Sequence, residues 1–251
     1  MDIELYDHQK KAVEKLKSGC ILCGGVGTGK SRTALAYYFS QENDGDMDVY
    51  SPMTNPNDLY IITTARKRDT LEWEGEMVPF LLSTDPDTNA YSNKVVVDSW
   101  NNIKKYSDVK NSFFIFDEQR VVGYGVWTKS FLKIAQHNRW ILLTATPGDT
   151  WMDYMPVFIA NGFFKNKTDF IRHHVVFNRF SKYPRVDRYV ESGKLLRYKR
   201  MITINMPYRK STIKHDKWVI TGYDRKLYFD TLKTRWNFFK DEPIRDAGQL
   251  Y

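Results

Sequence analysis

The chain has 251 residues and a formal net charge of +8. Its hydrophobic content of 42% and aromatic content of 15% are typical of a packed core and exclude a chain that is disordered throughout. No apolar run approaches the roughly 18–20 residues that span a bilayer. Residues Met1–Glu4 lack the basic and then apolar profile of a signal peptide. We therefore expect a cytoplasmic protein with no membrane partner.

The charge is divided unevenly along the chain. Residues 1–150 hold 17 Lys and Arg against 20 Asp and Glu, whereas residues 151–251 hold 21 against 10. A basic segment beside a nearly neutral one indicates a polyanionic partner. A solvated face and a surface for another protein domain are the open alternatives.

Residues 5–16 have the apolar spacing of a helix. This helix ends just before the first predicted strand, so its N-terminus is expected near the loop that follows that strand. The side-chain amide of Gln9 donates and accepts at once, as the N6 and N7 edge of adenine requires. Gln9 is therefore a candidate adenine reader and Tyr6 a candidate stacking partner, with an ordinary surface glutamine as the alternative.

A glycine-rich loop follows at residues 24–31, which read Gly-Gly-Val-Gly-Thr-Gly-Lys-Ser and fit the pattern GxxxxGK[ST] at every fixed position. Its glycines let backbone N–H groups surround a phosphate at a helix start. Lys30 is expected to contact the β- and γ-phosphates and the Ser31 hydroxyl to bind Mg²⁺. The flanks fit, because residues 19–23 have the pattern of a buried strand and residues 32–39 that of a helix. The sequence thus predicts a nucleoside triphosphate site. Its loop residues are Gly25, Val26, Gly27, Thr28, Gly29, Lys30, Ser31 and Arg32.

Residues 59–64 form the next predicted strand, and a helix that carries Trp73 follows. Between them lie Arg66 and Lys67. Basic and hydroxyl side chains at the C-terminal end of a strand, beside a helix start, suit a phosphate backbone. A solvated loop is an equal alternative.

The third and fourth predicted strands are residues 94–99 and 112–118. The fourth has four apolar residues before Asp117 and Glu118, which places it inside a parallel sheet with its carboxylates at the ligand-binding edge. Phosphoryl transfer needs charge neutralisation and an activated water. Asp117 is expected to hold Mg²⁺ through its water shell, and Glu118 to orient or deprotonate the attacking water.

A helix near residues 127–137 and a strand at residues 140–145 complete this pattern. Thr144 and Thr146 lie where that strand ends, so their hydroxyls are placed to link the γ-phosphate to a second site. Strands that alternate with helices predict an α/β fold with a doubly wound parallel sheet.

Taken in order, four segments resemble the Q motif and motifs I, II and III of superfamily 2 helicases. They are the helix with Gln9, the glycine-rich loop, the pair Asp117-Glu118 and the segment Leu143–Pro147. The likeness is greatest to Snf-type helicases encoded by bacteriophages. Residues 63–68 and 97–103 lie where motifs Ia and Ib fall, which makes Arg66, Lys67, Ser99 and Trp100 candidate nucleic-acid contacts.

The resemblance implies a RecA-like P-loop ATPase lobe over residues 1–165, with ATP and Mg²⁺ as ligands. It also implies that Gln9 reads adenine, and that Thr144 and Thr146 couple hydrolysis to movement along nucleic acid. DNA is favoured over RNA as the track. If the protein is encoded by a phage, its location is the host cytoplasm.

Two departures from the family pattern stand out. Motif II reads Asp-Glu-Gln-Arg at residues 117–120 instead of ending in Ala-His or Ala-Asp. Motifs IV to VI, which belong to a second RecA-like lobe whose arginines complete the ATP site, are not visible. We expect residues 166–251 to form a basic, aromatic-rich connector and the beginning of a second lobe, completed within a longer protein or by a separate chain. Hydrolysis by this chain alone is then expected to be slow.

Within this part, residues 151–163 and the residues from Asp224 onward read as helices, and residues 201–204 and 217–223 as strands. Residues 170–200 interleave cations with aromatic side chains, the composition of a single-strand contact surface. Arg185 and Arg188 are its leading candidates. An interlobe surface or a solvated face is an equal alternative.

The leading interpretation is the ATP-binding and ATP-hydrolysing lobe of a helicase or translocase. One alternative is the motor subunit of a nuclease or restriction-type assembly whose partner does the cutting. Another is a nucleotide-dependent nucleic-acid-binding module with little hydrolysis of its own.

Overall fold

The structure is a computed structural model that describes residues 3–49, 51–118, 121, 124–207, 222 and 224–244. The chain divides into two units, Met1–Arg209 and Lys210–Tyr251, and each is described by itself. The first unit holds the predicted nucleotide site. None of the described helices has the length and hydropathy to cross a membrane.

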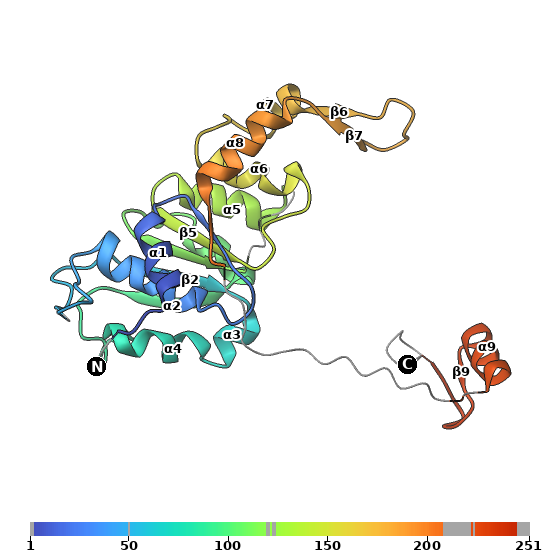
Figure 1. The fold of residues 1–251 in the computed structure, drawn as a ribbon, viewed down its shortest axis with the longest axis horizontal. Helices are drawn as coiled ribbons and strands as arrows, with labels where there is room; N and C mark the ends of the chain where they lie inside the picture. The colour runs from blue at the N-terminus through green and yellow to red at the C-terminus, as the bar shows by residue number, and fades with distance from the viewer. Residues whose placement is uncertain are drawn as a thin grey trace. The chain divides into compact units, whose positions relative to one another are not determined.

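Within the described residues, six parallel strands form the central sheet of the first unit in the order β3-β2-β4-β5-β1-β8 (Figure 1). These strands are β1 (Ile21–Cys23), β2 (Leu59–Thr63), β3 (Val95–Ser99), β4 (Phe113–Asp117), β5 (Arg139–Thr144) and β8 (Thr203–Asn205). Every residue of β2 and β4 is buried, because a parallel sheet is covered on both faces and its strands read as continuous apolar runs.

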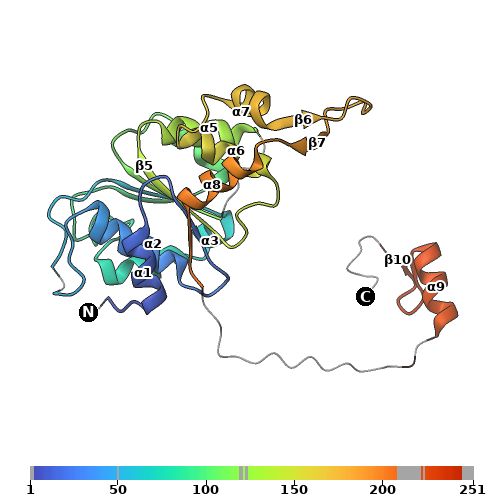
Figure 2. The same cartoon turned by 45° about the horizontal axis from the view of Figure 1, so that its top comes forward.

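Helices cover both faces of this sheet (Figures 1 and 2). One face packs against α1 (Asp7–Lys15), α2 (Lys30–Tyr37), the π-helix η1 (Tyr38–Glu42), α4 (Glu72–Met77) and the 3-10 helix η2 (Val78–Phe80). The other packs against the 3-10 helix η3 (Trp100–Tyr106), α5 (Val126–Ala135), α6 (Trp151–Ala160), α7 (Lys167–His174) and α8 (Ser192–Ile202). Strand residues alternate between the two layers, as Ile61 and Ile62 do. The predicted α/β doubly wound sheet is confirmed.

The basic stretch after α6 has more regular structure than its sequence pattern indicates. It contains α7, an antiparallel hairpin of β6 (Val175–Phe177) and β7 (Val186–Tyr189), and α8. Phe170 and Leu195 are fully buried against the sheet, and β8 pairs with β1. The first unit therefore extends to Arg209, beyond residue 165. The predicted strand at 201–204 begins two residues late, because Met201 and Ile202 end α8.

The second unit contains α9 (Arg225–Thr234) and a short antiparallel pair, β9 (Trp236–Asn237) and β10 (Glu242–Pro243). The Asp224 carboxylate caps α9 by accepting a hydrogen bond of 3.0 Å from the Leu227 N–H, which confirms the helix expected from Asp224. Of the strand expected at 217–223, only Gly222 is among the described residues.

We expect Phe116→Ala to lower the free energy of unfolding by about 3–5 kcal/mol. Phe116 is fully buried in β4, and its ring lies 5.0 Å from that of Phe131 and 5.5 Å from that of Trp100. The matched control is Phe180→Ala, because Phe180 is 99% exposed and its loss should change stability by less than about 0.5 kcal/mol. Denaturant unfolding measures both, and equal midpoints for the two variants would contradict the packing described.

Candidate nucleotide site

The glycine-rich loop joins the end of β1 to the start of α2, as the sequence predicts. Gly27 and Gly29 have φ of 80° and 75°, a conformation that glycine adopts without strain. A Cβ at Gly24 would lie 2.7 Å from Thr28 Oγ1, and one at Gly29 would lie 2.1 Å from Gln9 Nε2. The loop is thus a tight backbone cradle at a helix N-terminus, which is the geometry that binds phosphate.

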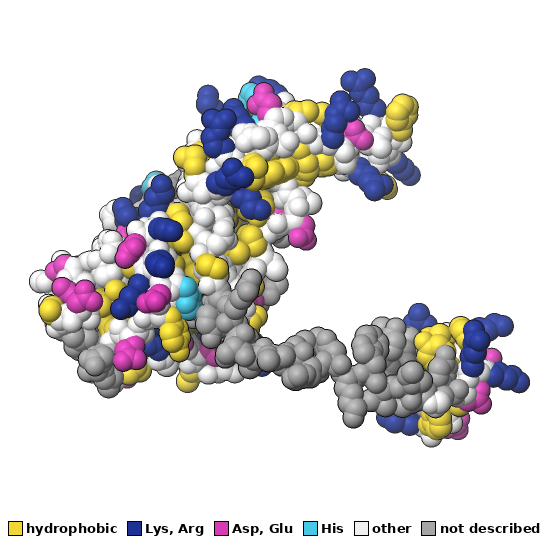
Figure 3. All heavy atoms as spheres, viewed as in Figure 1, with side chains coloured by type: hydrophobic (Ala, Val, Ile, Leu, Met, Phe, Trp, Pro, Cys, Tyr) yellow, Lys and Arg dark blue, Asp and Glu magenta, His cyan; other side chains and the backbone are white. Residues whose placement is uncertain are grey.

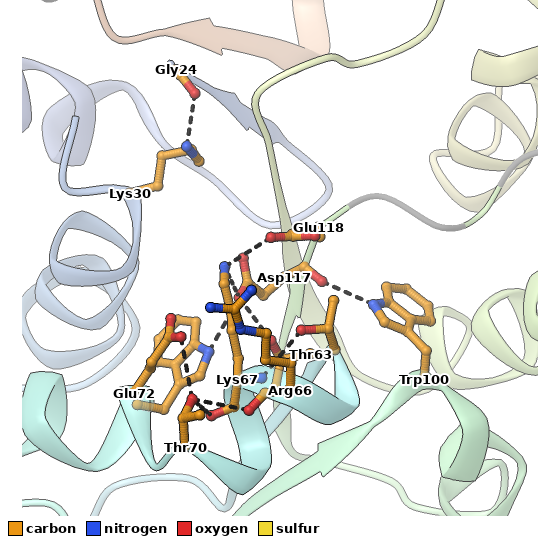
Figure 4. Close-up of polar contacts among 12 residues, drawn as sticks. Gly24, Lys30, Thr63, Arg66, Lys67, Thr70, Glu72, Trp100, Asp117 and Glu118 are labelled. Carbon is orange, nitrogen blue, oxygen red and sulfur yellow. Dashed lines mark hydrogen bonds and ion pairs between the residues drawn. The ribbon is translucent and has the colours of Figure 1, made fainter. Parts of the chain in front are cut away.

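Lys30 is turned back onto this loop. Its ammonium donates to the carbonyl oxygens of Gly24 at 2.7 Å and Gly25 at 3.0 Å (Figure 4). Burial lowers the pKa of Lys30, and the nearby Lys67 ammonium lowers it further, against the opposing effect of Asp117. The neighbouring Ser31 and Arg32 are half-buried.

Helix α1 braces the loop from the other side. Gln9 is 4% exposed, and its Nε2 lies 3.4 Å from the carbonyl oxygens of both Thr28 and Gly29. Its Oε1 accepts from the Tyr6 N–H at 2.8 Å, and His8 Nε2 lies 3.1 Å from the Thr28 oxygen. In this structure the Gln9 amide braces the glycine-rich loop, which we also call the phosphate loop. Its Nε2 faces two loop carbonyls and its Oε1 accepts from the Tyr6 N–H.

A cavity of about 910 Å³ opens beside Gln9 and the loop. Its lining residues are Ile3, Glu4, Leu5, Tyr6, Gln9, Lys10, Gly29, Arg32 and Glu76. Arg32 Nε donates to Glu76 Oε2 at 2.7 Å, so the guanidinium is held at the wall of the cavity. The side chains of Tyr6 and Gln9, predicted to contact adenine, both reach this space.

Asp117 ends β4 and is 1% exposed. Three donors converge on its Oδ2: Thr63 Oγ1 at 2.8 Å, Lys67 Nζ at 2.9 Å and Trp73 Nε1 at 3.2 Å. The Trp100 indole N–H also donates to the Asp117 main-chain oxygen at 2.9 Å (Figure 4). A buried carboxylate needs such partners, and here they come from β2, α4 and the short helix α3 (Ala65–Asp69), while η3 supplies the donor to the main-chain oxygen.

Lys67 also contacts the second acid of the pair, with its Nζ 3.1 Å from Glu118 Oε1. Burial acts to lower the pKa of Lys67, but the Asp117 and Glu118 carboxylates more than offset it, so that the pKa lies above its usual value. Glu118 has φ of 58°, a left-handed conformation that is uncommon outside glycine. Gln119 and Arg120, the unusual end of motif II, lie outside the described residues.

Strand β5 lies between β1 and β4 and carries Thr144 at its end. In the register of the sheet Thr144 is beside Cys23, and the adjacent Leu143 is beside Asp117. The Thr144 carbonyl accepts from the Gly24 N–H at 3.1 Å, and its hydroxyl accepts from the Thr146 N–H at 3.0 Å. Thr144 is buried and Thr146 exposed, so this segment runs from the phosphate loop to the surface.

The candidate nucleic-acid contacts of motifs Ia and Ib occupy different environments. Arg66 is exposed. Lys67 points toward the two acids, Ser99 is 2% exposed and Trp100 is 3% exposed. Ser99 and Trp100 are therefore interior residues in this structure, and burial of the ring leaves no face of Trp100 for a base to stack on.

Arg185 and Arg188 lie on the β6–β7 hairpin, residues 175–189, and both are exposed. Figure 3 shows the Lys and Arg side chains gathered over α7, α8 and this hairpin. Phe180 is 99% and Tyr183 72% exposed, and Lys182 Nζ lies 5.9 Å from the centre of the Tyr183 ring. Exposed cations and exposed aromatic rings thus lie on the same hairpin.

Sequence reasoning missed Thr63 and Trp73 as partners of Asp117. Thr63 ends an apolar strand, and Trp73 has the spacing of a core residue, so neither carries a local signal for the site. The position of Thr63 at the C-terminal end of β2 is the one clue in the sequence, whereas Trp73 lies in the first turn of α4.

The donors at this edge fit a magnesium nucleotide. Mg²⁺ prefers oxygen ligands and usually keeps several waters, with one or two protein ligands and the phosphates of the substrate. Ser31 supplies a hydroxyl from the first turn of α2, which follows β1, and Asp117 supplies a carboxylate from the end of β4. Strands β1 and β4 flank β5, so the glycine-rich loop and Asp117 lie at the same edge of the sheet.

No protein-family model and no curated protein matches the chain. Among solved structures, the chain is similar to a Sulfolobus solfataricus SWI2/SNF2 ATPase core in complex with double-stranded DNA. That match has a TM-score of 0.56 and 15% identity and covers 80% of this chain and 44% of that one. The chain thus spans less than half of that neighbour, and the likeness shows a shared RecA-like fold.

Two further matches have lower TM-scores. The Pyrococcus furiosus Hef helicase domain matches with a TM-score of 0.40 and 17% identity, over 68% of this chain and 39% of that one. The large terminase ATPase domain of Thermus phage P74-26 matches with a TM-score of 0.36 and 14% identity, over 59% of this chain and 68% of that one.

We expect Gly29→Ala to weaken ATP binding and to lower the free energy of unfolding by about 1–3 kcal/mol. The new Cβ would meet Gln9 Nε2 at 2.1 Å in a backbone conformation with φ of 75°, so the brace from α1 must shift. Gly193→Ala is the matched control, since a Cβ there meets nothing within 4 Å. Denaturant unfolding and titration with a fluorescent ATP analogue measure both effects. Equal behaviour of the two variants would show that the loop does not need glycine at position 29.

Proposed function

We propose that this chain is the ATP-binding and ATP-hydrolysing lobe of a superfamily 2 nucleic-acid motor that translocates on DNA and resembles the Snf-type helicases of bacteriophages. One observation carries the proposal. The phosphate loop after β1 and the pair Asp117-Glu118 after β4 lie at the same edge of the sheet, on either side of Thr144 at the end of β5. This arrangement brings the glycine-rich loop, two acids and a hydroxyl to one edge of the sheet, as a nucleotide site would require.

Each of these groups has a chemical task in the proposed reaction. Lys30 leaves the Gly24 and Gly25 carbonyls and neutralises the β- and γ-phosphates. Ser31 and Asp117 hold the nucleotide-bound Mg²⁺, which supplies charge neutralisation when present. Glu118 orients the attacking water and accepts its proton.

The groups around this centre connect it to recognition and movement. The cavity beside Gln9 and Arg32 receives the adenine base, with Gln9 joining the base to the phosphate loop that it braces. Thr144 and Thr146 transmit the state of the γ-phosphate to the surface, because the Thr144 backbone already contacts the loop at Gly24.

A second RecA-like lobe, in the same protein or in a separate chain, completes the ATP site with its arginines. An arginine of this kind contributes about 10³–10⁵ to the rate in related phosphoryl transfers. The chain alone therefore binds ATP and hydrolyses it slowly.

The β6–β7 hairpin and its flanking helices supply the nucleic-acid contact. The neighbour with the same fold is a SWI2/SNF2 core solved with double-stranded DNA, which supports DNA as the track. On this chain, exposed cations suit phosphates, and the exposed rings of Phe180 and Tyr183 suit bases.

We expect Glu118→Gln to lower the rate of ATP hydrolysis by about 10²–10⁴-fold while ATP binding is retained, because an amide keeps the shape of the carboxylate but accepts no proton. Lys30→Ala, by contrast, should lose ATP binding itself. Phosphate release with and without single- and double-stranded DNA and RNA, together with ATP titrations, separates the two outcomes. Polymer-stimulated hydrolysis that survives in Glu118→Gln would contradict its role as base.

We expect the double variant Arg185→Glu, Arg188→Glu to weaken DNA binding and to make its salt dependence shallower. Two lost phosphate contacts reduce the slope of log K against log salt by about 1.4–1.8. Lys15→Glu, Lys17→Glu is the matched control, because both lysines are exposed beside the N-terminal end of β1, away from the ligand edge. Fluorescence anisotropy at several salt concentrations measures the slope, and an unchanged slope in the hairpin variant would exclude this surface.

A further inference from the structure

Lys67 occupies a position that the proposed reaction does not use. Its ammonium lies 2.9 Å from Asp117 Oδ2 and 3.1 Å from Glu118 Oε1, and the Asp117 side chain is only 2% exposed. Figure 4 shows the lysine reaching from α3 to both acids. A single cation from the protein thus bridges the two carboxylates that the reaction needs.

The three donors on Asp117 Oδ2 differ in kind. Thr63 and Trp73 are neutral, fully buried and fixed, one in a strand and the other in the core face of α4. Lys67 is charged, sits on a flexible four-carbon stem and is 25% exposed at its side chain. Of the three, Lys67 is the donor that is able to leave without disturbing the core.

The helix that carries Lys67 is anchored independently of its ammonium. The Thr64 hydroxyl caps α3 by accepting from the Lys67 N–H at 3.3 Å, and Arg68 NH1 lies 3.2 Å from Asp98 Oδ1 on β3. Rotation of the Lys67 side chain, with α3 in place, is therefore sufficient to remove its ammonium from both acids.

We propose that Lys67 is a tethered counter-cation, which offsets part of the negative charge of Asp117 and Glu118 while the site holds no nucleotide and swings away when magnesium ATP binds. The inference rests on the proposed function, since it assigns a role to a residue facing the same two acids. Without a cation, the buried Asp117 carboxylate and the more exposed Glu118 carboxylate repel each other. With Lys67 in place, its ammonium contacts both carboxylates and offsets part of their negative charge.

The Lys67 ammonium and a divalent metal ion compete for the same two acids because both are positively charged. The ammonium and a divalent ion repel each other when both lie within contact distance of the same oxygens, and the divalent ion arrives with phosphates that Lys30 holds. Lys67 thereby discourages metal binding in the absence of nucleotide and yields to the magnesium nucleotide. It is a positioning residue, because it acts through the two acids.

The test measures metal binding to the nucleotide-free chain, with Tb³⁺ as the probe because it prefers oxygen ligands as Mg²⁺ and Ca²⁺ do. Trp73 and Trp100 both donate to Asp117, so they lie where they sensitise the luminescence of a bound lanthanide. We expect Lys67→Met to bind Tb³⁺ about tenfold or more tightly than the unmodified chain, a difference of about 1.4 kcal/mol. The conservative Lys67→Arg should keep the weak affinity.

Two further variants test whether the change in Tb³⁺ affinity depends on position 67 and on Asp117. Arg66→Met removes the neighbouring exposed charge of α3 and should leave Tb³⁺ affinity at the level of the unmodified chain. Asp117→Asn added to Lys67→Met should abolish the gain. If Lys67→Met does not fold, as judged by circular dichroism, Lys67→Gln replaces it and keeps a neutral hydrogen-bond donor.

Titration with magnesium ATP accompanies each measurement and separates the role of Lys67 from the proposed function. If magnesium ATP binds but Lys67→Met and the unmodified chain have the same Tb³⁺ affinity, Lys67 does not act as a counter-cation. Failure of the unmodified chain to bind magnesium ATP would overturn the proposed function, whatever the lanthanide result.

Discussion

The buried carboxylate of Asp117 is the constraint on which the rest of the site depends. Desolvation of a charge is costly unless hydrogen bonds and an opposite charge replace the lost water. Thr63, Lys67 and Trp73 provide that replacement at one oxygen, and Trp100 fixes the main chain of the same residue. Residues from β2, α3, α4 and η3 thereby meet at Asp117, three at its carboxylate and one at its main-chain oxygen.

The phosphate loop is tied to this acid through β5. The Gly24 N–H donates to the Thr144 carbonyl, and Leu143 is in register with Asp117. The other side of the loop is held by Gln9. The loop is thus held on both sides, by the end of β5 and by the start of α1.

The fold, and the glycine-rich loop and acids at one edge of its sheet, were predictable from sequence because they depend on local pattern. Apolar runs such as Phe113–Phe116 identify buried parallel strands, and the glycines before Lys30 identify a phosphate loop wherever they occur. Acids directly after a buried strand must emerge at its C-terminal edge. These inferences need no knowledge of which elements are neighbours.

The remaining features depend on neighbours that are distant in sequence. Trp73 reads as a core residue, and only the packing of α4 brings its N–H to Asp117, 44 residues away. Trp100 lies in the segment expected to touch nucleic acid but turns inward to the Asp117 carbonyl. The β6–β7 hairpin was hidden because its strands are three and four residues long and half exposed, so their alternation is weak.

The basic residues of α3 and those of the β6–β7 hairpin also differ in a way that the sequence does not indicate. On α3, Lys67 and Arg68 are paired with Asp117, Glu118 and Asp98, so a phosphate arriving there competes with existing carboxylates. On the hairpin, within residues 175–189, the one described ion pair joins Arg188 to its neighbour Asp187 at 3.7 Å. Exposed pairs of this kind contribute little, so a phosphate binds there without breaking a strong contact. Cations that look alike in the sequence therefore differ in their capacity to bind a polyanion. The difference is set by which carboxylates the fold brings to each of them.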